Sequence, residues 1–296
     1  MENNTLYIKQ INIENLWGKH QVYWELDPKV NILVGGNGSG KSTILNIIED
    51  VLIPGKYFYR YTKDRTTVKI AYNNKRTFKF GGTSSYGVSE VNEKGMWINN
   101  SGLTNGEYEH YDLLKAVKIS TFDVETPLSK QLDTLVYGDG EENTDCFLKF
   151  QNKKLMLQNE LLKSKKYEEA SLADKIIEDF YAITNSFFKE TAKKIVFQEQ
   201  KLSFEQNGDK INLTQLSAGE KQLLIILLTL LLQDAQPCLL LMDEPEISLD
   251  TAWQAILIEK IIALNPHCQL IIVTHSPSIF GEGWGDKLVW MEDIVK

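Results

Sequence analysis

Apolar residues follow two different spacings near the start of the chain. In LYIKQINIENL, Ile11 and Ile13 alternate with polar neighbours, which is the period-two pattern of a half-buried strand. KVNILVGG is a short apolar run that ends in glycines, and KSTILNIIEDVL then places Ile44, Ile47 and Ile48 at helical spacing. The chain therefore opens with strands, followed by a glycine-rich loop and a helix.

The pattern changes twice in the middle of the chain. Residues 56–124 contain short aromatic and β-branched runs separated by GG, NN and NEKG, which predicts an antiparallel β lobe. Residues 125–192 carry apolar side chains at three- and four-residue intervals without a sustained heptad, which predicts a helical insertion and not a long coiled coil. Asn207-Gly208 lies between alternating segments and predicts a hairpin.

Two very apolar runs, CLLLMDE and QLIIVTH, follow the hairpin. Such runs are typical of central strands in a parallel sheet that is covered on both faces. Helical segments precede and separate them, so the fold class is α/β.

Composition places the chain among ordinary globular proteins. Its 296 residues are 43% hydrophobic and 24% charged, with a formal net charge of −8. The most apolar stretch, Leu223–Leu232, is shorter than the roughly 18–20 residues of a membrane span, and MENNTLYIKQ lacks a signal-peptide core. The three cysteines form no C-x-x-C pair, which argues against a zinc site. We therefore expect a cytoplasmic protein that does not bind membranes.

GGNGSGKST fits the phosphate-binding pattern G-x-x-x-x-G-K-[ST] and lies between an apolar strand and an amphipathic helix. Glycines allow backbone amides to close around phosphate oxygens, and the helix N-terminus adds partial positive charge. Lys41 is expected to reach the β- and γ-phosphates, and Ser42 to ligate Mg²⁺. The predicted nucleotide-binding residues are Gly35, Asn37, Gly38, Ser39, Gly40, Lys41, Ser42 and Thr43.

CLLLMDEPE places Asp243 and Glu244 at the carboxyl end of a predicted buried strand, the end that faces ligands in open α/β sheets. Pro245 cannot continue the strand ladder. Asp243 is expected to hold Mg²⁺, and Glu244 to polarise the attacking water. The alternative is a strand end with two solvated acids.

Two further motifs each have a structural explanation as well as a functional one. In LSAGEKQ, Ser217 and Glu220 fit a capping box, and the same glycine-lined helix start could bind an anion. His275 in THS follows an apolar strand, where a single histidine is more often structural.

The five motifs GGNGSGKST, LSAGEKQ, DEPE, SLD and THS occur in the order found in ABC-type ATPases, which the chain resembles at its N-terminal 55 residues and after about residue 193. The resemblance implies a P-loop fold with a nucleotide-binding core at 1–55 and 193–296. It also implies two heads sandwiching two ATP molecules, with Ser217, Gly219 and Asp250 contacting the partner's nucleotide, and His275 acting as the switch histidine. Gln131 is the only candidate near the expected glutamine loop.

Within that superfamily, LSAGE and DEPEISLD resemble soluble SMC-like and OLD-like ATPases more than transporters, which usually carry LSGGQ and DEPTSALD. No Toprim domain or long coiled coil is evident, so the chain looks like a bare ATPase head. Compact OLD-like ATPases occur in anti-phage systems, which implies a switch acting on a separately encoded effector. The alternatives are a DNA-binding clamp using the basic, aromatic-rich segment Lys56–Lys79, and a transporter's nucleotide-binding subunit.

Overall fold

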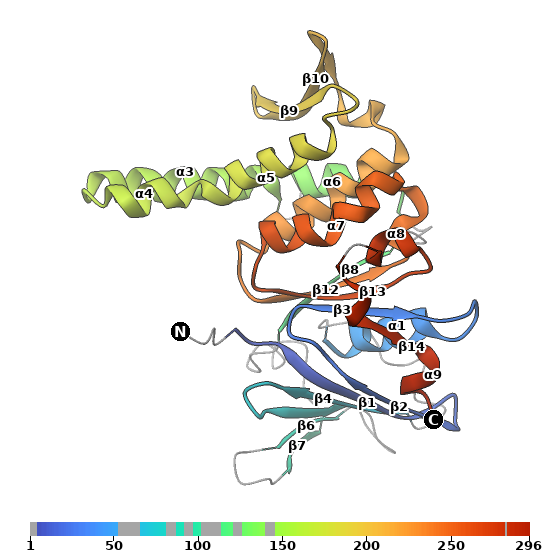
Figure 1. The fold of residues 1–296 in the computed structure, drawn as a ribbon. Helices are drawn as coiled ribbons and strands as arrows, with labels where there is room; N and C mark the ends of the chain where they lie inside the picture. Colours follow the sequence, from blue (N-terminus) through green and yellow to red (C-terminus); the bar gives the residue numbers. More distant parts are fainter. Residues whose placement is uncertain are drawn as a thin grey trace. The chain divides into compact units, whose positions relative to one another are not determined.

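The computed structural model describes residues 5–52, 66–80, 87–91, 97–101, 114–120, 126–139, 146–281 and 283–296. The chain divides into two compact units (Figure 1). The first comprises residues 1–120, 237–245 and 267–296, and the second comprises residues 121–236 and 246–266.

A five-stranded parallel sheet forms the centre of the first unit. Its strand order is β14 (Leu288–Trp290), β3 (Val30–Val34), β13 (Cys268–Val273), β12 (Cys238–Asp243) and β8 (Lys115–Ser120). Every residue of β3, β12 and β13 is buried, and for β12 and β13 this confirms the prediction that the two apolar runs CLLLMDE and QLIIVTH are central strands.

A six-stranded antiparallel sheet forms the second layer of this unit. Its order is β2 (His20–Glu25), β1 (Ile8–Leu16), β4 (Thr67–Tyr72), β5 (Thr77–Phe80), β6 (Gly87–Val91) and β7 (Trp97–Ser101). Strands β4–β7 of this sheet fall within the predicted antiparallel lobe, 56–124. Strands β1 and β2 pair into it, whereas β8 pairs in parallel with β12. Local spacing does not say which strands pair, because pairing is decided by residues far apart in sequence.

Helix α1 (Lys41–Leu52) packs between these layers. Its buried residues Ile44, Ile47 and Ile48 belong to a hydrophobic cluster that includes Ile11 of β1 and Val273 of β13. The short elements α8 (Pro277–Phe280), η5 (Gly285–Lys287) and α9 (Met291–Ile294) complete the unit. The helix that follows the glycine-rich loop is thus fixed against both sheets.

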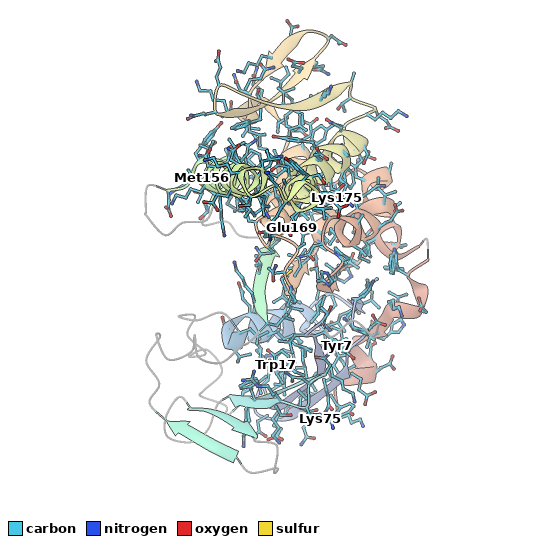
Figure 2. All side chains as sticks on the ribbon, turned by 90° about the vertical axis from the view of Figure 1, so that its left-hand side faces the viewer. Tyr7, Trp17, Lys75, Met156, Glu169 and Lys175 are labelled. Atoms are coloured by element: carbon cyan, nitrogen blue, oxygen red, sulfur yellow. The ribbon has the colours of Figure 1, made fainter. Side chains whose placement is uncertain are left out.

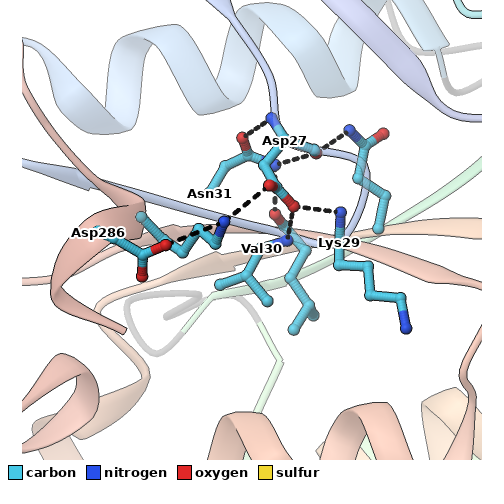
Figure 3. A network of polar contacts seen from close by, with 8 residues as sticks. Asp27, Lys29, Val30, Asn31 and Asp286 are labelled. Atoms are coloured by element: carbon cyan, nitrogen blue, oxygen red, sulfur yellow. Dashed lines mark hydrogen bonds and ion pairs between the residues drawn. The ribbon is translucent and has the colours of Figure 1, made fainter. Parts of the chain in front are cut away.

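A polar network fixes the start of β3 (Figure 3). The Asp27 carboxylate accepts hydrogen bonds from the backbone amides of Lys29 (2.8 Å) and Val30 (3.2 Å), and from Nζ of Lys287 (2.9 Å). The Asp27 carbonyl accepts bonds from the side-chain amides of Asn31 and Gln269. Partial burial raises the pKa of Asp27, but the bonds from Lys29, Lys287 and Val30 outweigh it, so the pKa is lowered overall.

The second unit contains six of the α-helices in the described residues and a small sheet. The helices are α2 (Leu128–Tyr137), α3 (Phe147–Lys163), α4 (Tyr167–Ala173), α5 (Lys175–Phe187), α6 (Ala218–Leu231) and α7 (Thr251–Leu264), with short turns η3 (Leu213–Gln215) and η4 (Pro245–Ser248) nearby. Strands β9 (Lys193–Gln198), β10 (Lys201–Gln206) and β11 (Asp209–Ile211) form an antiparallel sheet. Asn207 (φ 53°) and Gly208 (φ 91°) make the predicted hairpin turn.

Helices α2–α5 fall within the predicted helical insertion, 125–192. Helices α6 and α7 and the hairpin, which the sequence placed in the nucleotide-binding core, group with α2–α5. Helix α6 is buried on nearly all sides, so its apolar residues give no single face from which its partners could be deduced.

Helices α3 and α4 expose an unusual number of large apolar side chains, including Met156 (Figure 2). These are Leu155, Met156, Leu157, Leu162, Tyr167 and Leu172. Even so, no helix in the described parts of the chain is long and apolar enough to cross a membrane.

Candidate functional site

The glycine-rich loop Gly35–Gly40 connects β3 to the first turn of α1. Gly38 (φ 74°) and Gly40 (φ 100°) adopt left-handed conformations that residues with side chains rarely adopt. The loop therefore turns tightly at the N-terminus of a 12-residue helix, where free backbone amides favour an anion. Asn37 and Gly38 are exposed at the tip, and Thr43 lies in the first turn of α1.

Lys41 lies folded over this loop. Its Nζ donates to the carbonyl oxygens of Gly35 and Gly36, each at 3.0 Å, and only 5% of the residue is exposed. Ser39 Oγ is buried and has no hydrogen-bond partner among the described residues. A buried hydroxyl normally has a partner, so its position suits a phosphate oxygen.

Ser42 and Asp243 meet beside the loop. Ser42 Oγ donates to Asp243 Oδ1 at 2.9 Å, and Asp243 is 5% exposed at the end of β12. A hydroxyl and a carboxylate are oxygen ligands of the kind that Mg²⁺ prefers, and Mg²⁺ usually completes its shell with phosphate and water. These two residues therefore fit the predicted metal site.

Glu244 and His275 come together from neighbouring strands. His275 Nε2 lies 3.5 Å from Glu244 Oε1, and both side chains are partly exposed. Glu244 adopts a left-handed conformation (φ 47°), held by the hydrogen bond from its amide to the Val273 carbonyl at 2.8 Å. Strained non-glycine residues concentrate at functional sites, so the backbone conformation of Glu244 favours a functional role independently of its motif.

The strand order explains how these residues meet. The glycine-rich loop follows β3, His275 follows β13, and Asp243 ends β12, and these three strands are adjacent and parallel. Their carboxyl ends therefore lie at one edge of the sheet, where open α/β folds bind ligands.

Trp17 lies beside the glycine-rich loop and was not among the residues predicted from the motifs. It lies in the turn between β1 and β2 with φ 53°, and 42% of it is exposed (Figure 2). A Cβ added to Gly40 would overlap its ring, so the indole lies directly against the phosphate-binding loop. The only sequence signal was an aromatic residue next to Gly18 and Lys19, in the turn before β2.

Ser217 is the N-cap of α6 in the second unit. Its Oγ accepts from the amide of Glu220 at 3.2 Å, and Glu220 Oε2 accepts from the amide of Ser217 at 2.8 Å. The capping box, considered above as the structural explanation of LSAGEKQ, is therefore present. The motif therefore lies at the N-terminus of a 14-residue helix.

Gly219 lies against the backbone of the segment that carries Asp250. An added Cβ at Gly219 would meet the carbonyl oxygen of Ser248, so any side chain there displaces this segment. Asp250 caps α7 by accepting from the amide of Ala252 at 2.8 Å. The two predicted in-trans motifs thus lie side by side in the second unit.

Gln131, the candidate for the glutamine loop, lies in α2. Its side-chain amide donates to the Thr126 carbonyl at 2.7 Å.

Comparisons with known proteins agree with this arrangement. Residues 6–83 match the family described as "AAA ATPase domain", and residues 148–281 match "AAA domain, putative AbiEii toxin, Type IV TA system". No curated protein matches the sequence.

Three solved structures have a similar fold. The SMC head bound to the C-winged helix domain of ScpA has a TM-score of 0.60 at 16% identity, covering 93% of this chain and 91% of that one. The SMC head domain from Thermotoga maritima has a TM-score of 0.51 at 17% identity, with the same coverage. The recombination mediator RecF in complex with ATPrS has a TM-score of 0.50 at 15% identity, covering 93% and 94%.

Proposed function

From the fold of an SMC-like P-loop ATPase, we propose that this chain binds Mg-ATP at the glycine-rich loop and hydrolyses it to ADP and phosphate. The observation that carries the proposal is the convergence of Lys41, the Ser42–Asp243 pair and the Glu244–His275 pair at the carboxyl ends of three adjacent strands. Each group has a distinct role in transferring a phosphoryl group to water.

Lys41 and the loop amides bind and orient the β- and γ-phosphates. Ser42 and Asp243 hold Mg²⁺, which when bound neutralises charge on the phosphate oxygens. Glu244 orients the attacking water and accepts its proton, and His275, at 3.5 Å from that carboxylate, helps to hold water and γ-phosphate in line.

We further propose that ATP closes two copies head to tail. Ser217, Gly219 and Asp250 of one copy then contact the nucleotide bound by the other. Two observations support this: the side-by-side packing of these motifs in the second unit, and the exposed apolar side chain of Ile247 (51% exposed) just before Ser248.

Glu244→Gln tests the catalytic half of this proposal. The substitution keeps the size of the side chain but removes its basicity, so hydrolysis should fall by roughly 10²–10⁴ while ATP still binds. A closed dimer should accumulate, which light scattering with Mg-ATP would detect. Single-turnover hydrolysis within a few-fold of wild type would place the base elsewhere.

Ser217→Arg in the Glu244→Gln background tests the dimer half. The bulky cation should block closure while each monomer still binds ATP, because the glycine-rich loop belongs to the other unit. A Glu244→Gln/Ser217→Arg protein that dimerises as fully as Glu244→Gln alone would leave LSAGE as a helix cap only.

A switch of this kind acts through a partner that binds the ATP-closed dimer. We propose a separately encoded effector protein in anti-phage defence, supported by the match of residues 148–281 to a toxin–antitoxin ATPase family. Affinity capture with ATP should retain the partner on Glu244→Gln and lose it on Lys41→Ala. Equal capture by both variants would exclude a partner that reads the ATP state.

Nucleic-acid binding through Lys56–Lys79 stays a second prediction. Residues 56–65 lie outside the described residues, and of the remainder Lys69 pairs with Glu14 and Arg76 lies over the Phe78 ring at 5.1 Å. Two of the basic residues therefore already make contacts within the protein. A steep fall in DNA affinity with salt would support the clamp function instead.

A further inference from the structure

A shielded ion pair connects β9 to the start of α6. Lys193 Nζ lies 2.6 Å from Glu220 Oε1, and only 14% and 6% of the two side chains are exposed. Removing two charges from water is costly, so a shielded ion pair adds little net stability. Its presence here therefore needs a reason other than stability.

The second carboxylate oxygen of Glu220 indicates what the ion pair does. Oε1 binds Lys193, whereas Oε2 accepts the amide of Ser217 at 2.8 Å. Both oxygens of the carboxylate are therefore committed, one to the cation and one to the backbone of the signature serine. The orientation of Ser217 depends on Glu220, and that of Glu220 depends on Lys193.

Lys193 is itself firmly supported. Ala192, directly before it, is held in a left-handed conformation (φ 54°), and Gln206 Nε2 donates to the neighbouring Thr191 carbonyl at 2.7 Å. Lys193 also pairs with Gln206 in the β9–β10 ladder, and Asn185 Oδ1 of α5 accepts the amide of Ile195 at 2.9 Å. The cation is thus presented from a fixed strand end, and not from a mobile surface chain.

We propose that Lys193 is a positioning residue for Ser217, acting through Glu220. It sets the shape of the signature loop that meets the other copy's γ-phosphate, and so deepens the proposed function, on which it rests. Without Lys193, Glu220 is left buried without its counter-ion and turns toward water, which releases the Ser217 amide.

Lys193→Met tests this, because it keeps the length of the side chain and removes only the charge. Hydrolysis is measured against both ATP and protein concentration, and ATP affinity is measured on monomer by calorimetry. We expect monomer affinity within two-fold of wild type and a maximal rate about 10- to 100-fold lower, the usual range for a supporting residue. Half-maximal activity should require more protein.

Two matched variants separate positioning from general damage. Lys193→Arg restores the cation and should recover most of the rate, whereas Lys194→Met, at the exposed next position of β9, should behave as wild type. Wild-type kinetics in Lys193→Met would overturn the proposal. An equal loss of monomer ATP affinity would also overturn it, because that reports damage beyond the signature loop.

If Lys193→Met does not fold, Lys193→Met/Glu220→Ala leaves no unpaired buried charge and also removes the acceptor of the Ser217 amide. It should fold and show the same rate defect, and a wild-type rate would again overturn the proposal. Failure of the proposed function looks different: wild-type hydrolysis would then be independent of protein concentration, and Ser217→Arg would hydrolyse ATP normally.

Discussion

Replacing Gly219 by alanine separates two explanations for a glycine in a helix start. By helix propensity alone, Gly→Ala in the first turns of α6 should stabilise the protein by up to about 1 kcal/mol. The structure predicts the opposite, because the new Cβ would lie 2.1 Å from the carbonyl oxygen of Ser248. Real Cβ contacts essentially never fall below 3.0 Å, so one backbone must move by at least 3.0 − 2.1 = 0.9 Å.

Overpacking of this kind costs roughly 1–3 kcal/mol, which exceeds the gain in propensity. We therefore expect a net loss of up to about 2 kcal/mol, and a fall in Tm of roughly 2–4 °C for each kcal/mol. The displaced segment carries Asp250, so ATP-dependent dimerisation and hydrolysis should fall together, while monomer ATP affinity stays unchanged because the glycine-rich loop lies in the other unit.

Thermal unfolding, calorimetry with ATP, and light scattering measure the three effects. Gly285→Ala is the control, since a Cβ there would meet nothing within 4 Å. A Gly219→Ala protein that is more stable than wild type and dimerises normally would refute the packing argument, and propensity would then decide the position.

Three other substitutions follow from the contacts described above. Lys41→Ala should abolish measurable Mg-ATP binding in calorimetry while circular dichroism stays native, and unchanged binding would refute the loop assignment. Trp17→Ala should weaken nucleotide binding by the equivalent of about 1–3 kcal/mol if the exposed indole stacks on a base, and titration with ATP against pyrophosphate distinguishes this from phosphate binding. Because the folded pKa of Asp27 is lowered, its contribution to stability is present above the unfolded pKa and lost as pH falls through the folded one. Asp27→Asn should therefore lower the free energy of unfolding by roughly 0.5–1 kcal/mol at pH 7 and by almost nothing near pH 2, and an equal loss at both values would exclude the charge as the cause.

Local sequence was enough to predict the elements that carry most of the candidate site residues. The glycine spacing before Lys41, the apolar strand before Asp243 and the apolar strand before His275 each depend on residues close in sequence. Buried parallel strands are very apolar and their carboxyl ends lie at one edge of the sheet, so the strand before each of the three motifs brings that motif to the same edge. The capping box of Ser217 and Glu220 was likewise readable, because both residues lie within one turn.

Tertiary structure decided what those residues touch. The indole of Trp17 covers Gly40, the Ser248 carbonyl fills the space beside Gly219, and Lys193 neutralises Glu220 across 27 residues. None of these contacts has a periodic signal, because each depends on strand pairing and helix packing between distant segments. The same reason explains why β8 joined the parallel sheet and β1 the antiparallel one: the period of a strand sets its faces, and only its neighbours set its place in a sheet.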